Sequence, residues 1–261
     1  MKRMDYKERI AALAGSEEER MTLQQVCERL LRGQMRQSSA FSRFLTQREQ
    51  ALVAQLLPDC LFFGGVREAE RCVACYLPEW YDEAELLTQG PICCLRGYFH
   101  DKNALTHRDV LGALMGTGIR RDAIGDIYLS ETQCDFFALA ELSKYLLDNL
   151  TDAGRQRLRL EQIPLAEAVR PPQEMKEVRV SVASLRLDGV LASAFHLSRS
   201  DAAAAVCAGA AGIGGLPCLK PDRSVQEGDV LSLRGRGKLR VLSLGGQTRR
   251  GRLSLTLGLY V

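Results

Sequence analysis

Arginine and hydroxyl side chains near the C-terminus of this 261-residue chain form a pattern that is suited to binding phosphate. Ser198, Arg199 and Ser200 are followed by Asp201 and an apolar run, which is the pattern of a helix N-terminus. Such an end offers free backbone N–H groups and the positive end of the helix dipole, and Arg199 adds a guanidinium. The sequence therefore predicts an anion site at this helix. The alternative is that Ser198 is only a cap and Arg199 a solvated residue.

Further cations flank this helix on both sides. Arg186 falls in the first turn of an expected helix over residues 186–195, whose apolar residues recur at helical spacing. After Gly209 the chain predicts short strands and tight turns. This last part carries four more cations: Arg234, Arg236, Lys238 and Arg240. We expect these four to attract a phosphate backbone, or else to be solvated strand residues.

Charge is distributed unevenly along the chain. Residues 175–261 hold 13 Lys and Arg against 6 Asp and Glu, a net charge of +7, whereas the other 174 residues hold 22 against 26. The overall net charge of +3 hides this difference. A compact basic region beside an acidic remainder is typical of proteins that bind nucleic acid, because binding releases counterions from the phosphates. Within the acidic remainder, Arg32, Arg36 and Arg43 could also contact RNA, although a solvated helix face explains them as well.

The densest polar stretch in the middle of the chain covers residues 106–127. His107 and Asp109 could form an acid–base pair. However, Thr106 and Asp109 also mark a helix start whose Asp complements the dipole, and no nucleophile or metal-ligand set accompanies them. We therefore predict no catalysis here. The better candidates are the cations that bracket one helix and could hold phosphates: Arg108, Arg120 and Arg121.

The elements that position these residues predict an α+β organisation. Residues 1–58 are expected to be a helical N-terminal region. Residues 59–163 change to short apolar strands, and from Ile92 the order β-α-β-β-α-β predicts an RRM-like, ferredoxin-like plait. This plait lacks the aromatic pair with which such sheets stack bases. A linker over residues 164–176 then leads to a small helix-helix-sheet module over residues 177–261.

Cysteine usage and hydropathy indicate the compartment. The nine cysteines are an odd number scattered from Cys27 to Cys218, which predicts reduced thiols rather than disulfides. Cys72 and Cys75 have the spacing of half a zinc site, but they lie in an expected strand and no second pair follows. No apolar run approaches the roughly 18 residues that a membrane span needs, and the N-terminus resembles no signal peptide. We expect a cytoplasmic protein without metal or cofactor.

The C-terminal module resembles a known RNA-binding domain. Five short motifs carry the resemblance in the same order: Arg186-Leu-Asp188, Ser198-Arg-Ser200, Gly209, Gly228-Asp229 and Arg234-Gly235. They are similar to those of the domain named after ribosomal protein S-four, in which two short helices and an adjoining strand dock on structured RNA. One turn departs from that domain, because residues 210–214 stand where it commonly has a basic residue and an Asn. We leave this turn out of the site.

The chain as a whole resembles the bacterial YlmH family, through residues 44–49, residues 106–127 and the C-terminal motifs. The resemblance implies a non-enzymatic factor that binds the large ribosomal subunit carrying a stalled peptidyl-tRNA. It implies contacts with rRNA and tRNA during ribosome-associated quality control, beside a partner that recruits tRNA for C-terminal alanine tailing. Members are also linked to the cell-division gene neighbourhood. We expect a monomer that does not bind membranes.

Two other functions remain open. The first is an RNA-modifying enzyme, because pseudouridine synthases and some methyltransferases carry the same module, although theirs usually precedes a large catalytic domain. Arg186-Leu-Asp188 is similar to the Arg-Leu-Asp of a pseudouridine synthase site, but its place in the first helix of the module predicts a structural role for Asp188. The second is a cell-division adaptor, which would use the acidic N-terminal two thirds as its active surface.

Overall fold

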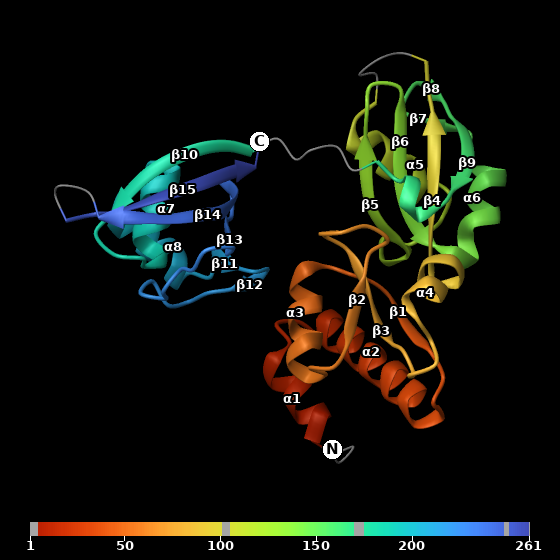
Figure 1. The fold of residues 1–261 in the computed structure, drawn as a ribbon, viewed down its shortest axis with the longest axis horizontal. Coiled ribbons are helices and arrows are strands. Elements are labelled where there is room, and N and C mark those ends of the chain that lie inside the picture. Colours follow the sequence, from red (N-terminus) through yellow and green to blue (C-terminus); the bar gives the residue numbers. More distant parts are fainter. Residues whose placement is uncertain (1–4, 101–104, 170–174, 248–250, 261) are drawn as a thin grey trace. The chain divides into compact units, whose positions relative to one another are not determined.

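The computed structural model describes residues 5–100, 105–169, 175–247 and 251–260 (Figure 1). The chain divides into two compact units, Met1–Pro171 (unit 1) and Pro172–Val261 (unit 2). Each unit combines helices with a sheet, so the predicted α+β fold class is confirmed. Among the described helices, none is long and apolar enough to cross a membrane.

The first part of unit 1 packs helices against a small antiparallel sheet of strand order β1-β3-β2. Its elements are α1 (Asp5–Leu13), α2 (Glu17–Arg36), β1 (Ala40–Leu45), α3 (Gln47–Leu56), β2 (Leu61–Phe63) and β3 (Cys72–Tyr76). The N-terminal part is largely helical, as predicted, but β1 interrupts it. Because β1 pairs with β3, the boundary predicted between residues 58 and 59 would separate strands of one sheet.

A tight chain reversal joins α2 to β1. Gln37 adopts a left-handed conformation with φ 51°, and the Ser38 N–H donates to the Gly33 carbonyl at 3.1 Å. This arrangement returns the chain beside the helix it has just left. Gly33 permits the close approach, because a Cβ there would lie 2.5 Å from the Cβ of Ala40.

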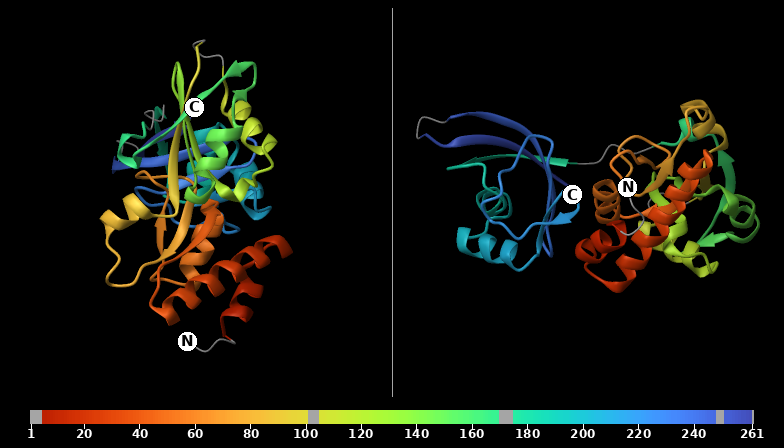
Figure 2. Two further views of the ribbon diagram at one scale, coloured as in Figure 1. Left: turned by 90° about the vertical axis from the view of Figure 1, so that its right-hand side faces the viewer. Right: turned by 90° about the horizontal axis from the view of Figure 1, so that it is seen from below.

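The second part of unit 1 is the predicted plait. After α4 (Glu83–Gln89), its elements are β4 (Ile92–Tyr98), α5 (His107–Gly116), β5 (Ile124–Leu129), β6 (Gln133–Leu139), α6 (Ser143–Asn149) and β9 (Arg159–Ile163). A short hairpin, β7 (Asp152–Ala153) and β8 (Gln156–Arg157), precedes β9. The sheet is antiparallel with order β5-β6-β4-β9, and α5 and α6 cover one of its faces (Figure 2). This is the ferredoxin-like arrangement.

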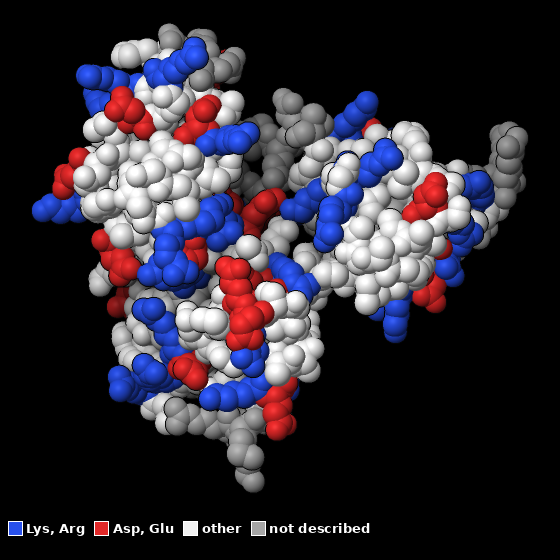
Figure 3. Space-filling model, turned by 180° about the vertical axis from the view of Figure 1, so that it is seen from behind, with Lys and Arg blue, Asp and Glu red and all other residues white. Residues whose placement is uncertain are grey.

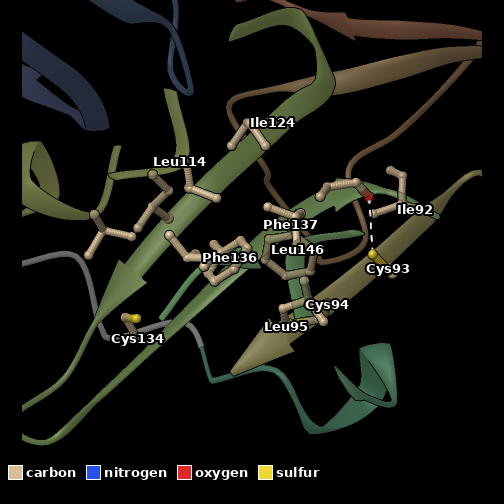
Figure 4. Packing of buried hydrophobic residues seen from close by; sticks show 14 of the residues in the cluster. Ile92, Cys93, Cys94, Leu95, Leu114, Ile124, Cys134, Phe136, Phe137 and Leu146 are labelled. Carbon is tan, nitrogen blue, oxygen red and sulfur yellow. Dashed lines mark hydrogen bonds between the residues drawn. The ribbon is translucent and has the colours of Figure 1, made fainter. Parts of the chain in front are cut away.

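One hydrophobic core joins the two parts of unit 1, and Figure 4 shows residues that the plait contributes to it. Phe136 and Phe137 on β6 are both 0% exposed, and consecutive strand residues point to opposite faces, so the sheet is covered on both sides at β6. Phe44 of β1 belongs to the same core, and a Cβ at Gly125 would lie 2.7 Å from its ring. The N-terminal sheet therefore packs directly against the plait.

Buried polar contacts reinforce this junction. The Asp126 carboxylate accepts hydrogen bonds from the backbone N–H groups of Glu70 (2.7 Å) and Arg71 (3.1 Å) and from the Tyr128 hydroxyl (3.0 Å). The Arg71 guanidinium donates in turn to the carbonyls of Ile124 (3.1 Å) and Phe44 (3.2 Å). Charged hydrogen bonds thus connect the segment before β3 to the plait.

The linker predicted over residues 164–176 is partly structured. Leu165 is buried in the core of unit 1, and the Val169 N–H donates to Asp135 at 2.8 Å. Asp135 is itself held by two 2.7 Å hydrogen bonds from Arg96. The strand β10 of unit 2 already begins at Met175, whereas Pro171 and Pro172 lie outside the described residues.

Unit 2 is a helix pair packed on a six-stranded antiparallel sheet, as the predicted helix-helix-sheet module requires. Its helices are α7 (Leu187–Phe195) and α8 (Arg199–Cys207). Its strands are β10 (Met175–Val182), β11 (Ala211–Ile213), β12 (Leu216–Pro217), β13 (Val230–Leu233), β14 (Gly237–Gln247) and β15 (Leu253–Tyr260). The strand β10 was not predicted, and it pairs along its whole length with β15.

Candidate RNA-binding surface

Two arginines from different helix ends converge on one buried carboxylate in unit 2. Arg186, the residue before α7, donates from Nε (3.1 Å) and Nη2 (2.9 Å) to Asp188. Arg199, the first residue of α8, places its Nε 3.6 Å from Oδ2 of the same carboxylate. We call Arg186 and Arg199 the α7–α8 arginine pair. Two guanidinium groups from different helix ends thus share one carboxylate.

Asp188 holds the arginine pair in place from inside the module. It is 3% exposed, and its carboxylate also accepts a 2.7 Å hydrogen bond from the Gly189 N–H. The Arg186 guanidinium lowers the pKa of Asp188 below its ordinary value, so the carboxylate stays charged at neutral pH. The structural role predicted for Asp188 is therefore visible in its contacts. Arg186 is the N-cap residue of α7 rather than a member of its first turn.

The first residues of α8 are largely satisfied by one another. The Ser198 hydroxyl accepts the Asp201 N–H at 3.0 Å and lies 2.7 Å from the Asp201 carboxylate. The Ser200 hydroxyl lies 2.8 Å from that of Ser198. The capping role of Ser198 is therefore present, and the carboxylate of Asp201 already occupies the end of the helix. Arg199, with 58% of its side chain exposed, is the cation of this end that faces solvent.

The four strand cations divide into two groups. Arg234 and Arg236 are exposed in the turn between β13 and β14. This turn lies at the C-terminal end of α7, because a Cβ at Gly237 would lie 4.0 Å from the Phe195 ring. Lys238 and Arg240 alternate along β14 with core residues, so they point to the sheet face away from the helices. The structure therefore does not unite all four with the arginine pair.

Figure 3 shows the charge asymmetry on the surface. Lys and Arg side chains dominate the visible face of unit 2, whereas both signs are intermixed on unit 1. On unit 2, Lys238 also lies over an aromatic ring, with its Nζ 5.7 Å from the centre of the Tyr260 ring. The basic character of residues 175–261 is thus a property of the surface of unit 2.

The middle-domain arginines occupy different environments. Arg108 is exposed on α5, and Arg120 is exposed with its guanidinium 3.0 Å from Asp122. Arg121 is half-buried and donates to the carbonyls of Ile124 (2.5 Å) and Gly125 (3.2 Å). Burial, with a further effect of the neighbouring Arg71, lowers the pKa of Arg121 to about 10. We therefore replace the predicted phosphate contact of Arg121 with a structural role.

The helix start at residues 106–109 explains the acidic residue there. Thr106 and Asp109 form a reciprocal capping box: the Asp109 N–H donates to the Thr106 hydroxyl at 3.2 Å and the Thr106 N–H to the carboxylate at 2.9 Å. These hydrogen bonds lower the pKa of Asp109. Burial and Arg121 lower the pKa of His107. The contacts of Asp109 are thus those of a helix cap.

The sheet face of the plait away from its helices carries internally paired side chains. The Tyr98 hydroxyl donates to Glu161 at 2.6 Å, and the Arg159 guanidinium lies 5.3 Å from the centre of the Tyr98 ring. Phe137, an aromatic residue of the adjacent strand β6, is fully buried. This face therefore offers Tyr98 but no exposed aromatic partner on β6 with which to stack a second base.

Within the described part of the chain, no group of three His, Cys, Asp or Glu side chains is arranged to hold a metal ion. Cys72 and Cys75 are buried free thiols on β3. Burial raises the pKa of Cys72 to about 12, which keeps the thiol protonated at neutral pH.

The fold and the arginine pair define a modular α+β protein in which a plait domain and a basic helix-pair module share one chain. A family model described as "Putative RNA-binding domain in YlmH" matches residues 98–167, which cover most of the plait. Ribosome-associated protein quality control protein P2 of Bacillus subtilis (strain 168) is 32% identical over 218 residues, covering 82% of this chain and 84% of that protein. The chain belongs to the YlmH family.

A solved structure extends the comparison at the level of the fold. Cell division protein ylmH from Streptococcus pneumoniae superimposes with a TM-score of 0.51, covering 60% of this chain and 97% of the solved one. Its sequence identity to this chain is 19%. This likeness concerns the fold alone.

Proposed function

We propose that this protein is a non-enzymatic RNA-binding factor that associates with the large ribosomal subunit. In this proposal it contacts rRNA and peptidyl-tRNA during ribosome-associated quality control, while a partner recruits tRNA. The observation that carries the proposal is the α7–α8 arginine pair, held by Asp188 on the basic unit 2. The name of the Bacillus subtilis relative supports the ribosome as the partner. A cytoplasmic, monomeric protein is the corresponding expectation.

The arginine pair is suited to phosphate for two reasons. A guanidinium presents a planar fork of N–H donors that matches phosphate oxygens, and these charged hydrogen bonds are stronger than neutral ones. Asp188 also fixes two Arg186 nitrogens, so less side-chain freedom is lost when RNA binds. We assign the specific docking to Arg186, Arg199 and Ser200.

The remaining cations supply attraction that does not depend on sequence. In unit 2 these are Arg234 and Arg236 beside the end of α7, with Lys238 and Arg240 on the opposite sheet face. In unit 1 they are Arg108 and Arg120, which are exposed on the plait. Removing any one of these cations should weaken RNA binding only modestly.

Co-sedimentation with ribosomes tests the proposal. The wild-type protein should migrate with the large subunit in a sucrose gradient, and an Arg186→Glu/Arg199→Glu variant should stay at the top. A Lys7→Glu/Lys144→Glu variant is the matched control, because it reverses two exposed cations of unit 1 and changes the net charge equally. Absence of the wild type from every ribosomal fraction would refute the ribosome-factor proposal.

Two further outcomes would change the proposal. Equal migration of the arginine variant and the control would remove the arginine pair from the site. Site-specific modification of rRNA that depends on Asp188 or Asp109 would show an RNA-modifying enzyme instead.

The single variant Arg199→Glu should lose more affinity for RNA than the removal of one phosphate contact explains, because the new carboxylate would stand at a helix N-terminus and repel the phosphate.

A further inference from the structure

A groove lies on the N-terminal part of unit 1, between the C-terminal half of α2 and the start of β1. It encloses about 490 Å³. Three arginines line one wall together with Gln25 and Glu28 of the same helix, and two serines of the chain reversal and an aromatic residue of β1 lie opposite: Arg29, Arg32, Arg36, Ser38, Ser39 and Phe41. The walls are fixed by the left-handed Gln37 and by the close approach at Gly33, so the groove is present without a ligand.

The three arginines form an exposed cationic row. Their spacing of three and four residues places them on one helix face, along roughly 10 Å of the axis. Within the described part of the chain, none of the three forms an ion pair. The helix dipole favours a cation at Arg36, in the last turn of α2, but it does not account for Arg29 and Arg32 in the middle of the helix. Three arginines against the single carboxylate of Glu28 leave the groove with a net positive charge, which a polyanion would neutralise.

Phe41, which lines the groove, is the first of three aromatic residues in contact, and the third is the exposed Trp80. The ring of Phe41 lies edge-on to that of Tyr81 with 6.1 Å between centroids, and the Trp80 ring lies 5.8 Å from Tyr81. Trp80 is 62% exposed. An exposed aromatic ring and a row of cations are the two components of single-strand nucleic-acid sites, in which bases stack and phosphates pair with cations.

We propose that this groove binds an unpaired segment of RNA. Arg29, Arg32 and Arg36 contact successive phosphates, the hydroxyls of Ser38 and Ser39 offer further hydrogen bonds, and a base stacks on Trp80. This site is separate from the arginine pair of unit 2 and does not depend on it. An acidic peptide would satisfy the arginines but would leave the exposed Trp80 ring without a stacking partner, so this ring favours RNA.

Trp80 provides a local readout, because it is the single tryptophan of the chain. Titration of the full-length protein with a short single-stranded oligouridine should quench its fluorescence in a saturable way. The quenching should persist in the Arg186→Glu/Arg199→Glu variant, which separates this site from the one in unit 2. An Arg29→Gln/Arg32→Gln/Arg36→Gln variant should lose at least about tenfold in apparent affinity, and its salt slope should fall by about 2, as expected for three phosphate contacts with a single strand.

Three results would overturn the inference. The first is the absence of quenching in the wild-type protein. The second is equal loss in the groove variant and in a Lys7→Gln/Lys144→Gln control, with circular dichroism confirming that both are folded. The third is quenching by polyglutamate at least as strong as that by oligouridine, which would assign the groove to an acidic protein partner.

Discussion

Replacing Asp188 with Asn separates the positioning of the arginine pair from simple charge attraction. The change keeps the size of the side chain but removes one negative charge, which raises the net charge of residues 175–261 from +7 to +8. If attraction alone governs RNA binding, Asp188→Asn should bind more tightly. If Asp188 positions Arg186 and Arg199, the variant should bind more weakly. The two explanations therefore predict opposite changes in RNA affinity for Asp188→Asn.

The size of the effect follows from the contacts of Asp188. Its carboxylate accepts two hydrogen bonds from Arg186 and one from the Gly189 N–H. An amide offers one oxygen instead of two, so at least one of these donors loses its partner, at a cost of about 1–3 kcal/mol. For a unit of this size we expect unfolding at a temperature lower by about 10 °C. Loss of one oriented guanidinium contact should weaken RNA binding by about tenfold.

The pH dependence of stability gives an independent check. Because Arg186 lowers the pKa of Asp188, the ionised carboxylate stabilises the folded state above its unfolded pKa of about 4. This contribution is lost as the pH falls through the lowered pKa of the folded state. The variant lacks it, so the stability difference between wild type and variant should shrink as the solution is acidified.

Two measurements decide the outcome. Hydrogen exchange of peptides from α7 in the full-length protein reports whether the helix remains folded, and fluorescence anisotropy with an rRNA fragment reports affinity. Unchanged or tighter binding by a variant whose α7 is still protected would refute the positioning argument. Arg186 and Arg199 would then act as independent charges.

Two further predictions concern unit 1. Asp126→Asn should destabilise this unit by about 1–3 kcal/mol in urea unfolding, because Arg71 and Tyr128 lose a charged acceptor at the junction, and an unchanged midpoint would show that packing alone holds it. Burial raises the pKa of Cys93 to about 11, whereas Cys207 is exposed, so iodoacetamide should modify Cys207 first and Cys93 only after unfolding. Mass spectrometry of partly labelled protein checks this order, and early modification of Cys93 would contradict it.

The plait could be predicted from the sequence because its elements follow one another without interruption. Gly90 and Pro91 precede its first apolar run, and Thr106 and Asp109 mark the start of its first helix, so the order from Ile92 could be predicted. The strand β1 was missed because its partner β3 lies about 30 residues away, and pairing at that distance leaves no local signal. The strand β10 did leave one, since Val178, Val180 and Val182 alternate. The predicted linker over residues 164–176 includes only Met175 and Lys176 of β10, and no element is predicted over the rest of this strand.

In the candidate site, too, features set by neighbouring residues could be predicted from the sequence, whereas contacts between helices could not. The cap of α8 could be predicted from four consecutive residues. The convergence of Arg186 and Arg199 on Asp188 depends on how two helices pack, which spacing alone does not determine. Arg121 has the same residue type and sequence context as its exposed neighbour Arg120, yet its guanidinium turns inward to backbone carbonyls. Residue type therefore does not distinguish the exposed Arg120 from the inward-facing Arg121.

The shared core of unit 1 determines which fragment of this protein can fold alone and so be moved between genes as one piece. The residues matched by the family model, 98–167, include Phe137 and Asp126, whose partners lie on segments before that range. A fragment cut to those limits would expose apolar surface where Phe44 packs and would leave the Asp126 carboxylate without two of its donors. The smallest piece that folds should therefore begin near the N-terminus, so gene fusions and deletions that respect this core should keep residues 5–169 together.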